Sequence, residues 1–242
     1  MSEGPRQYWI PSHVRACSTG AATVLLDLKR NRYFGVGARE TRALLALAGN
    51  WSKVNAQTSG AIEPMAPEEA AEIAEALVHA GLLSRVADGD APAAEVIDLD
   101  GLLRSAGHEL QRCAPIRFTH VVNFVRACVW ARRSLRARSL YSVVCKITHR
   151  KTCAGGCFDE HRAIELVTIF RRLRPYTFTA RDHCLFHALV LVDFLSRYEV
   201  FPMWVIGVRI RPWAAHSWVQ QGSLILDGNP EHICEYTPIL AA

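Results

Sequence analysis

The chain has 242 residues, of which half are apolar and 21% are charged, so it can bury one large core or two smaller ones. It contains no run of about 18 apolar residues, and its N-terminus, MSEGPRQYWIPS, lacks the basic-then-apolar pattern of a signal peptide. We therefore expect a cytoplasmic protein that does not bind membranes and whose eight cysteines are reduced.

The net charge of +5 is concentrated at residues 126–151 and again at 171–174. Solvated helix faces are the simplest interpretation of these basic residues. A docking face for an acidic partner and a nucleic-acid patch are the alternatives, and the sequence does not separate the three.

The N-terminal third predicts three short strands, at residues 13–17, 22–28 and 32–36. Helical spacing follows and ends at Gly49, a short helix is possible at 51–56, and Pro67 opens a second strong helix that stops at Gly81. Three strands followed by three helices indicate a winged-helix-like domain over residues 1–86. Its last helix is acidic, whereas a DNA-reading helix is basic, so we expect no nucleic-acid partner. The acidic residues are Glu68, Glu69, Glu72 and Glu75.

Residues 87–95, ADGDAPAAE, are small, acidic and contain proline, so we place a linker at 87–98 and a second domain at 99–242. A helix-rich stretch is expected from Leu102 onward, with helices around Phe124–Val129 and at 140–148 and 159–173. Together with the strands described below, these helices predict an α+β protein.

Cys153, Cys157 and His161 form a C-x3-C-x3-H pattern that could in principle bind zinc. The glycines at 155–156 interrupt any helix there, and the spacing differs from the usual C-x2-C of zinc sites. We therefore predict no metal and no other cofactor.

The C-terminal third begins with a cysteine where a helix should start. Asp182 is a plausible N-cap, and the following apolar residues have helical spacing with one buried face. Cys184 would lie in the first turn, where unpaired backbone N–H groups and the helix dipole favour a thiolate. Strands are then expected at 201–210, 214–220 and 223–227, with Gln221-Gly222 as a two-residue turn.

That turn would pair Gln220 with Ser223 and place His216 directly opposite Asp227, close enough for a hydrogen bond. We therefore predict a catalytic triad of Cys184, His216 and Asp227, in which His216 deprotonates the thiol. His187 lies three residues after Cys184 and could line the same cleft, but His216 is preferred because it has a predicted carboxylate partner. Asp193 is expected to be an exposed helix residue.

A cysteine at a helix start, a histidine on a strand and an aspartate on the next strand follow the order of a papain-like triad in transglutaminase folds. Here the chain resembles the transglutaminase-like B proteins of lasso-peptide biosynthesis. The segments that carry the resemblance are DHCLFHALVLVDFL, FPMWVIGVR, AAHSWV and LILDG. The resemblance implies a cysteine peptidase that removes the leader from a ribosomally made lasso-peptide precursor, and an ATP-dependent, asparagine-synthetase-like lasso cyclase as partner.

The strings VLLDLKRNRYFGV and VHAGLL resemble the leader-recognition domain of enzymes that modify ribosomal peptides. The resemblance implies that the leader adds as a strand to residues 32–36 and lies against the last helix of that domain. The expected leader-binding residues are Arg32, Tyr33, Phe34, Gly35, Val36, Ile73 and Leu77.

Three alternatives stay open. A transglutaminase-like acyltransferase would use the same triad but pass the acyl group to an amine instead of water. A non-catalytic peptide-binding or regulatory protein on the same fold would not need Cys184. A DNA-binding regulator ranks third.

Overall fold

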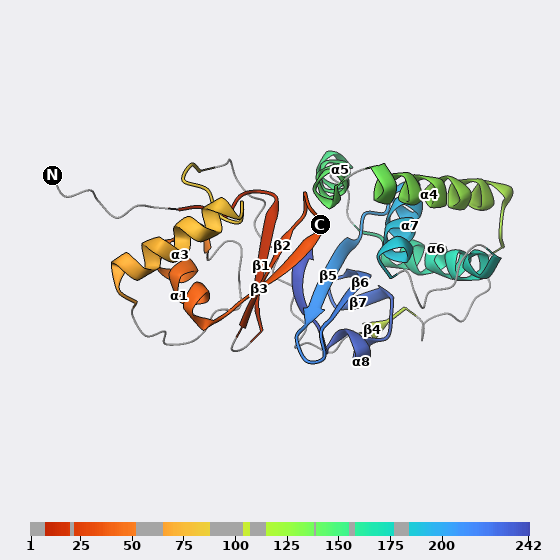
Figure 1. Cartoon of the computed structure of the whole chain (residues 1–242). Helices are drawn as coiled ribbons and strands as arrows, with labels where there is room; N and C mark the ends of the chain where they lie inside the picture. The colour runs from red at the N-terminus through yellow and green to blue at the C-terminus, as the bar shows by residue number, and fades with distance from the viewer. Residues whose placement is uncertain are drawn as a thin grey trace. The chain divides into compact units, whose positions relative to one another are not determined.

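The structure is a computed structural model, and it describes residues 8–19, 22–51, 65–87, 104–106, 115–137, 139–154, 158–176 and 184–242. The chain divides into two compact units, Met1–Val96 and Ile97–Ala242. Figure 1 shows the elements of both units. Each unit is described by itself.

The N-terminal unit contains a three-stranded antiparallel sheet of order β1-β2-β3, formed by Val14–Thr19, Ala22–Asp27 and Arg32–Val36. Two helices follow, α1 (Ala38–Leu47) and α3 (Pro67–His79). The three predicted strands and both strong helices are confirmed, although α1 ends two residues before Gly49. Of the short helix expected at 51–56, all residues after Trp51 lie outside the described residues.

The β2–β3 turn shows how local sequence fixes this sheet. Asp27 is buried, and its Oδ1 accepts hydrogen bonds from the backbone N–H groups of Lys29 (2.9 Å) and Arg30 (3.1 Å). Asn31 then takes a positive φ of 55°, which asparagine tolerates better than most residues. Sheet and helices share one hydrophobic core that includes Leu25 and Leu44.

The C-terminal unit combines helices with a five-stranded sheet of order β4-β7-β6-β5-β8. Figure 1 shows α4, α6 and α7 grouped beside this sheet. The helices are α4 (Phe118–Ala137), α5 (Leu140–Ala154), α6 (Glu160–Leu173), the 3-10 turn η1 (Arg174–Tyr176), α7 (Cys184–Ser196) and α8 (Pro230–Ile233). The strands are β4 (Arg104–Ser105), β5 (Met203–Arg209), β6 (Ala214–Gln221), β7 (Leu224–Asp227) and β8 (Thr237–Ala241). The mixture of helices and sheets confirms the α+β class.

The expected helices at 140–148 and 159–173 and the strands β5, β6 and β7 are confirmed, although α5 continues six residues beyond its expected end, to Ala154. Asp159 caps α6 by accepting a hydrogen bond from the backbone N–H of Arg162. Leu102 lies outside the described residues, and within the helix-rich stretch expected from there Arg104–Ser105 instead forms β4, parallel to β7. Strand β8, which pairs with β5, was not predicted.

Helix α7 differs from its prediction, because every residue from Phe186 to Leu195 is buried, rather than one face. Asp193 is therefore not an exposed residue: its side chain is fully buried. Its carboxylate accepts hydrogen bonds from Arg150 (2.7 Å) on α5 and from Arg197 (2.6 Å), one helical turn later. These two arginines neutralise a charge that would otherwise be costly to bury. Among the described residues, no helix is long and apolar enough to cross a membrane.

Candidate functional site

Cys184 is the first residue of α7, as the sequence predicts, and its side chain is half-buried. The backbone N–H groups of a first helical turn have no partner within the helix, so they can bind a developing negative charge. The proposed N-cap, Asp182, lies outside the described residues.

His187, one turn further along α7, contacts the buried carboxylate of this site. Its Nδ1 lies 2.7 Å from Oδ2 of Asp227, the last residue of β7, and the two side chains are only 4% and 16% exposed. Burial raises the pKa of Asp227, but the hydrogen bond and charge of His187, with Arg171 and Arg174, outweigh burial and hold that pKa below its usual range. Asp227 is therefore a carboxylate at neutral pH.

The other ring nitrogen of His187 faces a donor. Arg174 Nη1 lies 3.5 Å from His187 Nε2, and the ring of Phe170 lies 5.3 Å away, centroid to centroid. When Nδ1 donates its proton to Asp227, Nε2 carries the lone pair, and the arginine points at it. His187 thus contacts a carboxylate at Nδ1 and an arginine at Nε2.

His216 lies on β6 and pairs with Gly207 of β5, not with Asp227. Its ring centroid lies 5.4 Å from that of Tyr236 and 5.3 Å from that of His232. Burial lowers the pKa of His216, and the charges of His232 and His187 lower it further, while Asp227 acts in the opposite direction. The ring is therefore neutral at pH 7 and able to accept a proton.

The predicted cross-strand pair of His216 and Asp227 is wrong, because Asp227 faces Val219. Two local features cause the difference. Gln221 pairs with Leu224, so the chain reverses one residue later than expected, with Gly222 at a positive φ of 53°. The register then shifts between Val219 and Gln220, at a β-bulge.

His232 and Tyr236, which border His216, were not identified from the sequence. They lie on and just after α8, which begins at Asn229-Pro230. An asparagine followed by a proline is a helix-start signal, and here the Asn229 side chain does accept from the N–H of Glu231. That signal could have placed a helix, and with it these residues, beside the strands.

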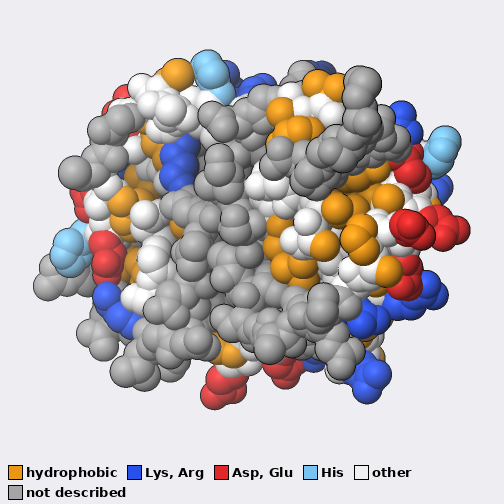
Figure 2. All heavy atoms as spheres, turned by 90° about the vertical axis from the view of Figure 1, so that its left-hand side faces the viewer, with side chains coloured by type: hydrophobic (Ala, Val, Ile, Leu, Met, Phe, Trp, Pro, Cys, Tyr) orange, Lys and Arg blue, Asp and Glu red, His pale blue; other side chains and the backbone are white. Residues whose placement is uncertain are grey.

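The expected leader-binding residues all lie on β3 and α3. Figure 2 shows one face of the molecule, on which Asp and Glu side chains (red) and Lys and Arg side chains (blue) are interspersed. Strand β3 is an edge strand of its sheet, and Arg32 and Gly35 are exposed on it. Val36 and Leu77 are buried in the core of the unit, with Phe34 and Ile73 packed against it, so these four side chains support the sheet and helix rather than lie open on the surface.

Cys157 lies outside the described residues, so the C-x3-C-x3-H pattern is described only in part. Cys153 is exposed, and its Sγ lies 3.8 Å from each ring nitrogen of His149, one turn earlier on α5. Among the described residues, no group of three or more His, Cys, Asp or Glu side chains is arranged to hold a metal ion.

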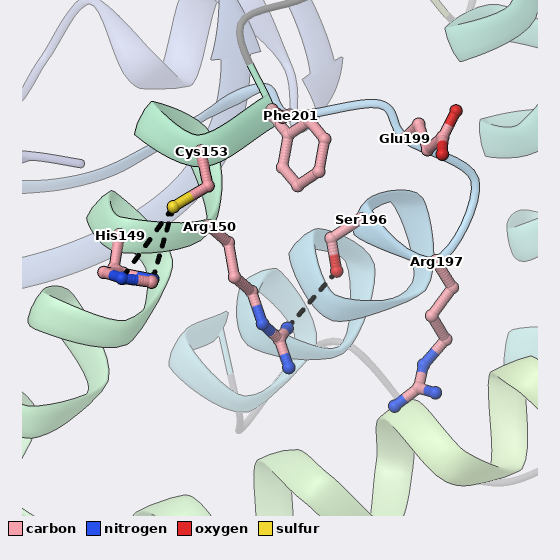
Figure 3. Close-up of a pocket in the computed structure, with 8 residues that line it drawn as sticks. His149, Arg150, Cys153, Ser196, Arg197, Glu199 and Phe201 are labelled. Carbon is pink, nitrogen blue, oxygen red and sulfur yellow. Dashed lines mark hydrogen bonds between the residues drawn. The ribbon is translucent and has the colours of Figure 1, made fainter.

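A cavity of about 860 Å³ lies at the other end of α7 from Cys184. Figure 3 shows Cys153 and His149 of α5 at one side of this cavity and Ser196 and Phe201, from the end of α7 and the loop after it, at the other. The thirteen residues of α7 span about 20 Å at 1.5 Å per residue, so this cavity is separate from the cysteine at the helix start.

Residues 124–241 match the model of the transglutaminase-like superfamily. No curated protein and no solved structure matches the chain. The matched residues include Cys184, His187, His216 and Asp227, and the superfamily suggests a cysteine-peptidase or acyltransferase-like fold. The chain therefore carries a transglutaminase-like domain at residues 124–241.

Proposed function

We propose that the transglutaminase-like domain is a cysteine peptidase with Cys184 as its nucleophile. The observation that carries this proposal is the carboxylate–imidazole pair of Asp227 and His187, one helical turn from a half-buried cysteine at a helix start. A half-buried thiol at a helix start, followed one turn later by a histidine that contacts a buried carboxylate, supports nucleophilic catalysis by cysteine.

His216 is the general base in this proposal, and Asp227, which contacts His187, also acts on His216 through its charge. The lowered pKa keeps His216 neutral and ready to accept the thiol proton, whereas both ring nitrogens of His187 face charged side chains. His187 then acts as a positioning residue that holds the Asp227 carboxylate in place. Direct use of His187 as the base is the competing assignment.

The reaction proceeds in two acyl transfers. Cys184 Sγ attacks the peptide carbonyl carbon as its proton passes to His216, and the oxyanion is stabilised by the backbone N–H of Cys184. The tetrahedral species collapses to a thioester, and the leaving amine takes the proton from His216. Water then attacks the thioester, gives a proton to His216 and releases a carboxylic acid, after which His216 returns the proton to the thiolate.

We propose the leader of a ribosomally made lasso-peptide precursor as the substrate. The N-terminal unit supports this choice of substrate, because β3 is an edge strand to which an extended peptide can add by main-chain hydrogen bonds. Arg32, Tyr33 and Gly35 would contact the leader directly, because the other predicted binding residues serve the core. Cleavage between leader and core would free the amine that an ATP-dependent, asparagine-synthetase-like cyclase closes into a ring.

The test is mass spectrometry of a lasso precursor incubated with the full chain, with and without the cyclase and ATP. We expect one cut in the wild-type protein, none with Cys184→Ala, and an unchanged cut with Cys153→Ala. The second variant is the matched control, because Cys153 is also exposed but lies on α5. Cleavage by Cys184→Ala, or an intact precursor in every wild-type reaction, would refute the proposal.

A further inference from the structure

Helix α4 carries an exposed apolar surface that the proposed chemistry does not use. Eight large apolar side chains are exposed among the described residues, and six of them lie between Ile116 and Val129. Phe118 is 81% exposed and Val125 is 48% exposed. Such clustering on a stable helix is typical of an interaction site, whereas scattered exposed apolar residues need no explanation.

The opposite side of α4 is packed, so the exposed face is not a helix that has failed to dock. Phe124 contacts the rings of Phe170 on α6 and Phe194 on α7, at centroid distances of 5.5 and 6.4 Å. Ala127 and Ala131 are fully buried on the same side. Figure 1 shows α4 beside α7 and α6. The helix therefore presents a second, outward apolar stripe from a rigid base.

The outward face has two halves. At 100° per residue, Phe118, Val122, Val125 and Val129 fall within one narrow stripe, and Arg133 and Arg136 continue the same stripe toward the C-terminal end. Both arginines are exposed. The apolar residues and the arginines thus follow one another along a single face, instead of lying on opposite faces of the helix.

The charged side chains in the sequence around α4 are all positive. From Leu110 to Phe158 the chain has eight arginines and two lysines and contains no Asp or Glu. Part of this charge has an internal role, because Arg150 binds Asp193, and Arg132 lies over the Phe186 ring with its Cζ 5.8 Å from the centroid. Arg133 and Arg136 still give the end of the stripe a positive field that favours a carboxylate-bearing partner.

We propose that the outward face of α4 is the docking surface for a partner protein that presents an apolar patch beside a cluster of carboxylates. A membrane-binding helix would separate apolar and basic residues around its circumference, whereas Arg133 and Arg136 of α4 share one stripe with its exposed valines. A nucleic-acid surface would be basic throughout, whereas half of this face consists of valine and phenylalanine. Protein is the partner class that matches both halves.

The binding probe is the purified asparagine-synthetase-like cyclase. This choice of probe rests on the proposed function. Its binding to the full chain carrying Cys184→Ala is measured by calorimetry at two salt concentrations. We expect the double change Phe118→Ser with Val125→Ser to raise Kd at least tenfold. We expect Arg133→Glu with Arg136→Glu to raise Kd similarly and to flatten its salt dependence.

Two matched controls lie elsewhere. Val86→Ser removes an exposed apolar side chain from the N-terminal unit, and Arg162→Glu reverses the charge of an exposed arginine on α6. Neither is expected to change Kd by more than twofold. Equal binding by all variants, or no binding of the cyclase to the parent chain, would overturn the inference. So would sedimentation of the chain with phosphatidylserine vesicles that the α4 variants abolish.

A loss of cyclase binding can be distinguished from a loss of peptidase activity. Leader release without the cyclase is measured on the same α4 variants with a functional Cys184, and it should match that of the wild-type protein, because none of these residues belongs to the candidate site. Loss of cyclase binding with intact leader release would locate the surface; loss of both would indicate unfolding and would count against the inference.

Discussion

Replacing Asp227 with asparagine tests the buried pair at the centre of the site. Asparagine keeps the size of the side chain and can still accept from His187, but it removes the charge. Hydrogen bonds to charged groups contribute about 1.5–3 kcal/mol and neutral ones about 1 kcal/mol, so the difference predicts that Asp227→Asn costs roughly 1 kcal/mol at pH 7. For a domain of this size that corresponds to a fall in Tm of about 2–4 °C.

The cost should depend on pH in one direction. The pKa of Asp227 is lowered in the folded protein, so the stability that its charge provides is complete above the unfolded value of about 4 and is lost as the pH falls through the folded value. Denaturant unfolding of wild type and Asp227→Asn from pH 7 to pH 3 measures the difference. The two proteins should differ at pH 7 and converge below about pH 4.

A surface ion pair supplies the control for this measurement. Arg104 Nη2 lies 2.9 Å from Glu160 Oε1, but both side chains are about half exposed. Such pairs contribute about 0–1 kcal/mol, so Glu160→Gln should have a smaller effect than Asp227→Asn. Equal stability of wild type and Asp227→Asn at pH 7, or a difference that does not change with pH, would contradict the reasoning.

Four further predictions concern the residues around the pair. His216→Gln should lower the rate of leader release about 10²–10⁴-fold, and His187→Gln far less, in single-turnover assays; the reverse order would make His187 the base. Because the pKa of His216 is lowered, kcat/KM should fall with acidification only below about pH 6.5, and a limb above pH 7 would assign it to another group. Asp193→Ala should cost about 3 kcal/mol in denaturant unfolding, since it leaves two arginines without their buried partner. Gly207→Ala should cost about 1–3 kcal/mol, since its Cβ would lie 2.7 Å from the Trp218 ring; an unchanged midpoint would show that the ring can move away.

The sequence was sufficient to locate most helices and strands, because apolar periodicity and turn residues act locally. It was not sufficient for the register between β6 and β7. A turn displaced by one residue and a bulge at Val219 moved Asp227 away from His216, and neither feature has a strong local signal.

The partner of His187 could not be predicted for a related reason. It depends on how α7 packs against the sheet, and the two residues of the pair lie forty positions apart. The burial of Asp193, by contrast, could have been predicted from the residues around it. An aspartate inside the apolar run ALVLVDFL is more consistent with a buried, paired carboxylate, and Arg197 stands at the i+4 position that would pair with it.

The measurement that tests the central claim most directly is leader release carried out in H₂¹⁸O. If Cys184 forms a thioester that water hydrolyses, the leader fragment from the wild-type protein will carry one ¹⁸O in its new carboxylate, and Cys184→Ala will release no fragment. A labelled fragment from Cys184→Ala would contradict the role of the cysteine. A leader that instead acquires the mass of an added amine, with no ¹⁸O, would show an acyltransferase in place of a peptidase.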